Sequence, residues 1–182
     1  MLFRSGGHLI PSLLRIHATP VVVPERIRRM FFFTPELLHR WQRWYGLPFP
    51  VLLDPKDPLA SDVRLFRVFV NPWTARRWTT LGAPALLQTF DLAVSSLTAF
   101  EFEARLRLGD HGRLGGFLVH FEADLAEGIR ISTEPSCVDK SNHWRIPLWL
   151  LPSILKVRAG EKLLARIALG RMPTFEMRVD RS

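Results

Sequence analysis

The sequence predicts a mainly β fold, an antiparallel β-barrel or sandwich that carries one short helical insertion. Apolar and polar residues alternate along many short stretches, turn-forming residues separate these stretches, and no strand–helix–strand rhythm links them. The composition fits such a fold, because 47% of the 182 residues are hydrophobic and 23% are charged. A chain of this length can bury one substantial core.

The first strand is predicted at residues 13–23, which are rich in β-branched and apolar side chains. A helix is predicted next, at residues 35–45. Thr34 is suited to the N-cap, Pro35 to the first helical position and Glu36 to the first turn. Gly46 then supplies a stop signal. The apolar residues between these signals recur at helical spacing, and they are Leu37, Leu38, Trp41 and Trp44.

The rest of the chain is predicted to consist of strands. Residues 47–58 hold four prolines, which exclude a long helix, and alternation with a period of two begins at residues 63–68. In residues 98–108 the apolar side chains share one face and the charged side chains share the other. Residues 109–112 are typical of a hairpin turn, so residues 117–125 are expected to return antiparallel to that strand. Further strands are predicted at residues 129–133, 144–151, 155–157, 163–169 and 175–179.

The net charge of +8 and the pI of about 10.9 favour attraction to anionic partners such as nucleic acid or anionic surfaces. The arginines are spread along the whole chain and form no basic run, so nucleic acid is not expected as a partner and a solvated surface is favoured. No apolar stretch is long enough to cross a membrane as a helix, and no membrane partner is expected. Cys137 is the only cysteine, which excludes an intrachain disulfide and fits a cytoplasmic location.

Several stretches, in this order and at this spacing, resemble the C-terminal β-barrel of the protein arginine N-methyltransferases. They are Gly6-Gly7-His8-Leu9-Ile10-Pro11, residues 86–92, residues 115–125, Ser132-Thr133-Glu134-Pro135 with Asn142-His143-Trp144, and residues 155–163. The resemblance implies that residues 6–182 form the barrel domain. Residues 25–60 would then be its inserted helical arm.

In this family the arm docks on the methyltransferase domain of the partner in a head-to-tail homodimer. The resemblance places this role on Phe31, Phe32, Phe33, Leu37, Leu38, Trp41 and Trp44. The alternative is that these aromatic side chains fill a local core. Contiguous exposed apolar surface usually marks an interface, which favours the arm.

The resemblance also assigns a substrate-pocket role to Asn142, His143 and Trp144. The histidine is expected to meet an acidic residue of the methyltransferase half, and the tryptophan to help wall the slot for the substrate guanidinium. A flat cation binds well against an aromatic face. Asn142 stands where the family has threonine, but it keeps a hydrogen-bonding side chain. The alternative is a tryptophan at the rim of the barrel, with its N–H bonded to a carbonyl.

A nucleoside-binding loop is not found, because no Gly-x-Gly step follows a predicted strand. The intact enzyme is expected to use S-adenosylmethionine and to methylate a protein arginine, whereas this chain is expected to bind no cofactor and to be inactive alone. Glu101 and Glu103 are expected to be surface charges rather than the family's paired glutamates. His120, Glu122 and Asp124 share one face of a strand, but no metal site is expected there.

Residues 1–5 do not fit the family pattern and are expected to be a non-native leader. Their codons can match the end of a common sequencing adapter, with GTG read as the start. The chain is therefore expected to be a fragment of a larger methyltransferase. A different class of function is the alternative, namely a free-standing β-sandwich adaptor or nucleic-acid-binding module that uses the arginine-rich surface.

Overall fold

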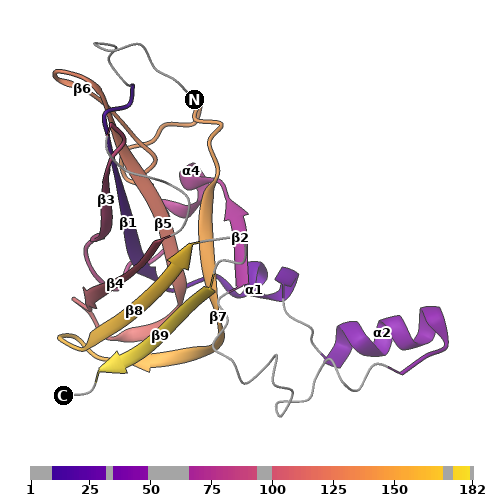
Figure 1. Ribbon diagram of the computed structural model, residues 1–182. Coiled ribbons are helices and arrows are strands. Elements are labelled where there is room, and N and C mark those ends of the chain that lie inside the picture. Colours follow the sequence, from indigo (N-terminus) through magenta and orange to yellow (C-terminus); the bar gives the residue numbers. More distant parts are fainter. Residues whose placement is uncertain (1–9, 32–34, 49–65, 94–99, 170–173, 181–182) are drawn as a thin grey trace.

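The computed structural model describes residues 10–31, 35–48, 66–93, 100–169 and 174–180. They form two antiparallel β-sheets with helical segments along one side (Figure 1). The larger sheet has the strand order β2-β7-β5-β1-β3, with β6 paired to β5, and the smaller sheet has the order β4-β8-β9. Strand bounds are β1 Leu13–Val21, β2 Phe66–Val70, β3 Ala85–Asp91, β4 Phe100–Arg107, β5 Gly112–Ala126, β6 Ile129–Ser132, β7 Ile146–Val157, β8 Lys162–Leu169 and β9 Thr174–Asp180.

The predicted fold class is confirmed, and so are most of the predicted strands. One difference concerns β7, which runs through the two separate strands predicted at residues 144–151 and 155–157. Its register with β5 shifts between Leu114 and Gly116. Such an irregularity lets a strand bend and continue where proline interrupts the ladder, and Pro152 lies in this part of β7.

The hairpin predicted between residues 98–108 and 117–125 is wrong. Strand β4 pairs with β8 from Phe100 to Arg107, whereas β5 pairs with β1, β6 and β7. The turn between them bonds to another segment, because the backbone N–H groups of Gly109 and Asp110 both donate to the carbonyl of Leu81. This turn therefore carries the chain from one sheet to the other.

The predicted helix at residues 35–45 is confirmed as α2, Pro35–Tyr45. Two further short helices, α1 (Glu25–Phe31) and α4 (Pro72–Ala75), were not expected. For α4 the signal was present in the sequence: Asn71 caps the helix by accepting a hydrogen bond from the Trp73 backbone N–H, with Pro72 in the first position. Of the described helices, none is long and apolar enough to span a membrane.

Two apolar clusters hold the sheets. The first lies between them and includes Leu106, Leu114, Phe117 and Leu163. The second joins α4 and Trp78 to the other face of the larger sheet. Strands β5 and β7 approach each other closely between these clusters. A Cβ at Gly116 in β5 would overlap the carbonyl oxygen of Trp149 in β7.

Several predictions lie outside the described residues. These are the leader at residues 1–5, the step at residues 6–9, Phe32 and Phe33 of the arm, most of residues 47–60, and the ends of two predicted strands at residues 63–65 and 98–99.

Candidate functional site

The loop that carries the predicted pocket residues joins β6 to β7. Thr133 anchors its start, because its backbone N–H donates to the Phe121 carbonyl at 2.9 Å and its Oγ1 accepts from the Phe121 N–H at 3.0 Å. Asp139 shapes the middle by accepting both the backbone N–H and the hydroxyl of Ser141. These hydrogen bonds hold the pKa of Asp139 below its usual range.

Asn142 orients the tryptophan that follows it. Its Oδ1 accepts a hydrogen bond from the Trp144 backbone N–H at 2.8 Å, a local turn that asparagine forms readily. The Trp144 ring lies 5.3 Å from the Phe121 ring, at an interplanar angle of 59°. With 47% of its surface exposed, Trp144 contacts the barrel on one side and leaves the other side open.

His143 is exposed, with its ring centroid 6.4 Å from that of Trp144. Among the described residues no hydrogen bond is formed by either ring. The three predicted pocket residues therefore lie together at the rim of the barrel, and the indole N–H is not bonded to a described carbonyl as the packing alternative required.

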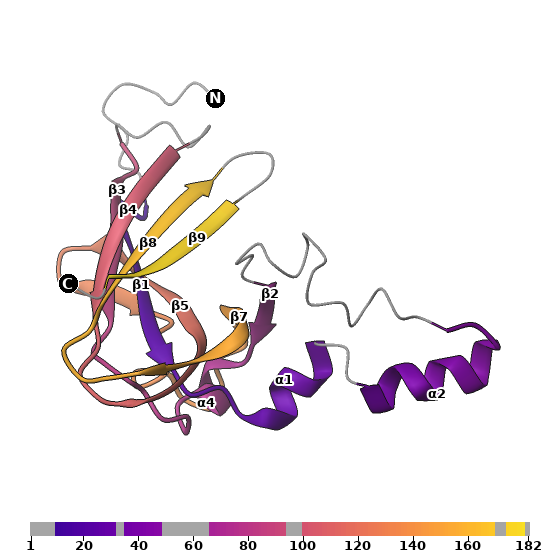
Figure 2. The same cartoon turned by 90° about the horizontal axis from the view of Figure 1, so that it is seen from below.

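The arm has two parts that differ in their contact with the barrel. Helix α1 lies against the sheets, whereas α2 extends away from them (Figure 2). On α2, Leu38 is buried, Leu37 and Trp41 are half-buried, and Trp44 is 66% exposed. Phe31 ends α1, and Phe32 and Phe33 are outside the described residues. Exposure on α2 therefore increases from Leu38 to Trp44.

Arg28 fastens α1 to the barrel. Only 8% of its surface is exposed, and its Nη1 donates to the carbonyl oxygens of Leu151 at 3.0 Å and Gly115 at 3.2 Å. Both carbonyls lie where the ladder between β5 and β7 is interrupted. Burial lowers the pKa of this guanidinium, while nearby Glu25 opposes the shift.

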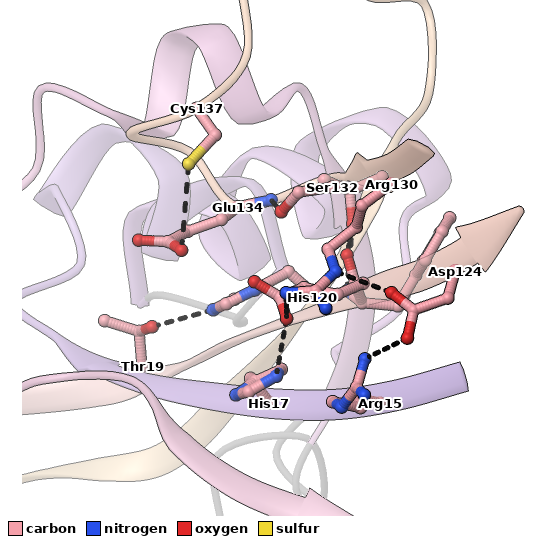
Figure 3. A network of polar contacts seen from close by, with 12 residues as sticks. Arg15, His17, Thr19, His120, Asp124, Arg130, Ser132, Glu134 and Cys137 are labelled. Carbon is pink, nitrogen blue, oxygen red and sulfur yellow. Dashed lines mark hydrogen bonds and ion pairs between the residues drawn. The ribbon is translucent and has the colours of Figure 1, made fainter. Parts of the chain in front are cut away.

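A ladder of polar side chains crosses β1, β5 and β6 on the outer face of the larger sheet (Figure 3). Asp124 accepts from Arg15 at 2.8 Å and from Arg130 at 2.6 Å. These two bonds hold the pKa of Asp124 below its usual range. Glu122 lies 3.7 Å from Arg130 and 3.8 Å from His17.

Two histidines continue this ladder. The rings of His17 and His120 stack at 5.5 Å, and a hydrogen bond of 3.0 Å joins His120 Nε2 to Thr19 Oγ1. His120 is 2% exposed, and its Nδ1 has no partner among the described residues. Burial lowers the pKa of His120 to about 4, with Glu134 opposing the shift, so the ring is neutral at pH 7.

His120, Glu122 and Asp124, which share one face of β5, lie within this ladder. Each of these side chains has its own partner on β1 or β6, so they do not converge on one point. In the part of the chain that the structure describes, no group of three or more histidine, cysteine or acidic residues is arranged to hold a metal.

Beside the ladder, an open hollow of about 460 Å³ is lined by Thr19, Trp78 and Glu134 among others. The Glu134 carboxylate is engaged, because it accepts the Ser136 hydroxyl at 2.6 Å. At its edge, the Arg76 guanidinium lies 4.2 Å above the Trp73 ring. Two of its polar side chains are thus bonded within the protein, since Thr19 is joined to His120 and Glu134 to Ser136.

The family is decided by comparison with known proteins. A family model described as the arginine methyltransferase oligomerization subdomain matches residues 31–180. The chain belongs to this family. A search of curated proteins finds no match.

Among solved structures, a chain of the Trypanosoma brucei PRMT1 enzyme-prozyme heterotetrameric complex with AdoHcy has a similar fold, with a TM-score of 0.63 and 21% identity. The match covers 93% of this chain and 51% of that one. The chain thus spans about half the length of the methyltransferase structure it matches.

Sequence reasoning missed Arg28 and the β1 side of the ladder. Arg15, His17 and Thr19 are alternate polar positions in an apolar strand, which was a usable signal for one polar face. Arg28 had no such signal. Its partners are backbone carbonyls 87 and 123 residues away, and because every residue has a backbone carbonyl, the sequence does not indicate which ones Arg28 binds.

Proposed function

We propose that this chain is the substrate-side and dimerisation barrel of a protein arginine N-methyltransferase. In the intact enzyme S-adenosylmethionine would donate a methyl group to an arginine guanidinium of a protein substrate. The observation that carries the proposal is the half-exposed Trp144, oriented by Asn142 beside an exposed His143 within the matched region. This chain would supply no cofactor site of its own.

The open side of Trp144 suits one wall of a slot for a planar cation. An indole attracts a guanidinium electrostatically, most strongly where water is excluded. Asn142 and Phe121 would limit the motion of the ring, so that less orientation is lost when the substrate enters. His143 is free to meet a carboxylate of the methyltransferase half, which would close the slot.

We also propose that α1 and α2 form the arm of a head-to-tail homodimer. Arg28 holds α1 on the barrel, and the exposed Trp44 and Tyr45 of α2 would be buried on the methyltransferase domain of a second subunit. The bounds of this arm, residues 25–60, the leader at residues 1–5 and a cytoplasmic location belong to the same proposal. The single cysteine supports the location.

Substitution of Trp144 in the intact enzyme tests the substrate slot. We expect Trp144→Ala to lower kcat/KM for an arginine peptide on the order of a hundredfold, because a positioned guanidinium loses one wall. Trp144→Phe should recover part of this loss. The matched control is Trp73→Ala, which removes a partly exposed indole far along the chain and should leave the rate nearly unchanged.

The melting temperature of each variant separates positioning from packing. If Trp144→Ala and Trp73→Ala lose stability and activity in equal proportion, the slot assignment is wrong and Trp144 is a packing residue. A rate loss confined to Trp144→Ala, at an unchanged melting temperature, supports the slot.

The arm is tested by the association state of the chain alone. With no partner domain, Trp41 and Trp44 should drive self-association, and Trp41→Gln with Trp44→Gln should relieve it without changing β content. Sedimentation and circular dichroism measure the two properties. Strong hydrogen-exchange protection of residues 35–45 in dilute monomer would instead show that α2 is part of the core.

A further inference from the structure

Two turns lie side by side at one end of the barrel. Residues 108–111 lead from β4 to β5, and residues 158–161 lead from β7 to β8. The Leu108 backbone N–H donates to the Glu161 carbonyl at 2.9 Å, and the Gly160 N–H donates to the Leu108 carbonyl at 2.8 Å. The strand ends that flank these turns are therefore gathered in one place, although they come from distant parts of the sequence.

Like charges face one another across two of these strand pairs. Arg107 is directly opposite Lys162 in the β4–β8 register, and Arg113 is directly opposite Lys156 in the β5–β7 register. Like charges in such positions destabilise a sheet. All four side chains are exposed, and none forms an ion pair within the described residues. The Arg113–Lys156 pair has no acidic residue opposite it in the described ladder, whereas Lys162 is also opposite Asp180, which offsets part of the repulsion from Arg107.

We call this region the basic end, and define it by Arg105, Arg107, Arg113, Lys156, Arg158 and Lys162. The acidic residues around it are fewer. Glu161 is partly engaged, since its carboxylate accepts the Arg158 backbone N–H at 3.0 Å. The others are Glu103, exposed Asp110, and Asp180, which is opposite Lys162 in the β8–β9 register. Basic residues therefore dominate this end.

The chemistry of the basic end indicates the class of partner. A protein interface needs buried apolar anchors at its centre. None of the exposed large hydrophobic residues of the described chain falls within residues 103–113 or 153–164. A phosphate backbone needs only a set of cations. The charges also come from both sheets and from the turns between them, which suits a flexible strand better than a flat bilayer.

We propose that the basic end binds the phosphate backbone of a single-stranded nucleic acid. No exposed aromatic side chain is available there for base stacking among the described residues, so the contacts are to phosphates alone and the binding is independent of sequence. This activity goes beyond the proposed methyltransferase role and does not depend on it.

Fluorescence anisotropy with a labelled single-stranded RNA tests the proposal on the full chain. The key variant combines Arg107→Gln, Arg113→Gln, Lys156→Gln and Lys162→Gln. Its matched control combines Arg26→Gln, Arg43→Gln, Arg77→Gln and Arg145→Gln, which are exposed and remove the same charge elsewhere. At about 50 mM salt the key variant should bind at least about tenfold more weakly than the wild type, and the control should bind nearly as well.

The salt dependence gives a second readout. Each lost phosphate contact should flatten the plot of log affinity against log salt by about 0.7, so four contacts should flatten it by about 3. Equal weakening of both variants would show that only net charge matters. Tighter binding to phosphatidylserine vesicles than to RNA would assign the surface to membranes. Either result, or no RNA binding by the wild type, overturns the proposal.

Folding of the key variant is checked by its melting temperature, which should change little, because repulsive pairs are removed together with the attraction of Lys162 to Asp180. If the fourfold variant does not fold, the pairs Arg107→Gln/Lys162→Gln and Arg113→Gln/Lys156→Gln replace it. Each pair should then give about half of the change in slope. A failure here leaves the Trp144 experiment unaffected, because that experiment measures methyl transfer.

Discussion

The two halves of strand β5 differ in the charges that lie opposite them. Near its end, Asp124 and Glu122 face arginines on β1 and β6, and every charge in the ladder has an opposite neighbour. Near its start, Arg113 faces Lys156, and no opposite charge is paired with either in the described chain. The charged side chains of the ladder form ion pairs with one another within the barrel. The basic end leaves its charges available to a partner outside it.

Arg28 lies beside the basic half of β5 but, unlike the other arginines described there, its guanidinium is buried. Arg28→Ala should destabilise the barrel by about 2–6 kcal/mol, since each of two buried carbonyls loses its donor at about 1–3 kcal/mol. Chemical denaturation measures this loss. Arg29→Ala, at an exposed position one residue away, should change stability by less than about 0.5 kcal/mol.

Hydrogen exchange in α1 gives an independent readout for Arg28. If Arg28 positions the arm, Arg28→Lys should keep part of the stability but loosen α1, and hydrogen exchange in residues 25–31 should increase. Equal stability of Arg28→Ala and Arg29→Ala would show that the contact with the bulged strands contributes nothing.

The histidine part of the ladder should make the barrel sensitive to acid. The folded pKa of His120 is about 4, below its ordinary value of 6.5, so the unfolded chain binds more protons between these pH values. Stability is therefore full above about pH 6.5 and falls as the pH drops toward 4. The loss should approach about 3 kcal/mol, at about 1.4 kcal/mol for each pH unit.

Denaturation between pH 7 and pH 4 checks this with two variants. His120→Gln should remove most of the pH dependence in this window, whereas exposed His111→Gln should retain it. An unchanged pH dependence in His120→Gln would assign the acid sensitivity to other groups.

The smallest expected effects are the stability changes from removing one charge opposite each half of β5. Lys156→Gln relieves a repulsive pair and should stabilise the barrel by about a few tenths of a kcal/mol. Arg15→Gln removes a partner of Asp124 and should destabilise it. Both changes should shrink at high salt, because exposed charges are screened. Shifts of the same sign in the two variants would remove the distinction between the two halves.

Much of the fold followed from the sequence alone. Alternation with a period of two determined nearly all the strands, because it records which side of each strand faces the core. Pro35 and the spaced apolar residues predicted α2, because helix-start residues and helical period are local signals; the predicted cap, Thr34, lies outside the described residues. The ordered motifs around Asn142, His143 and Trp144 determined the family, which the comparison then established.

Only the tertiary structure decided which strands pair. Alternation shows which side of a strand faces the core but does not identify the neighbouring strand. The turn signal predicts β5 as the partner of β4, whereas the ladder, extended by the Leu108 N–H bond to Glu161, pairs β4 with β8. The same cause hid Arg28, whose partners are backbone carbonyls. It also hid the basic end, since arginines that look scattered along the chain come together only when two distant turns meet.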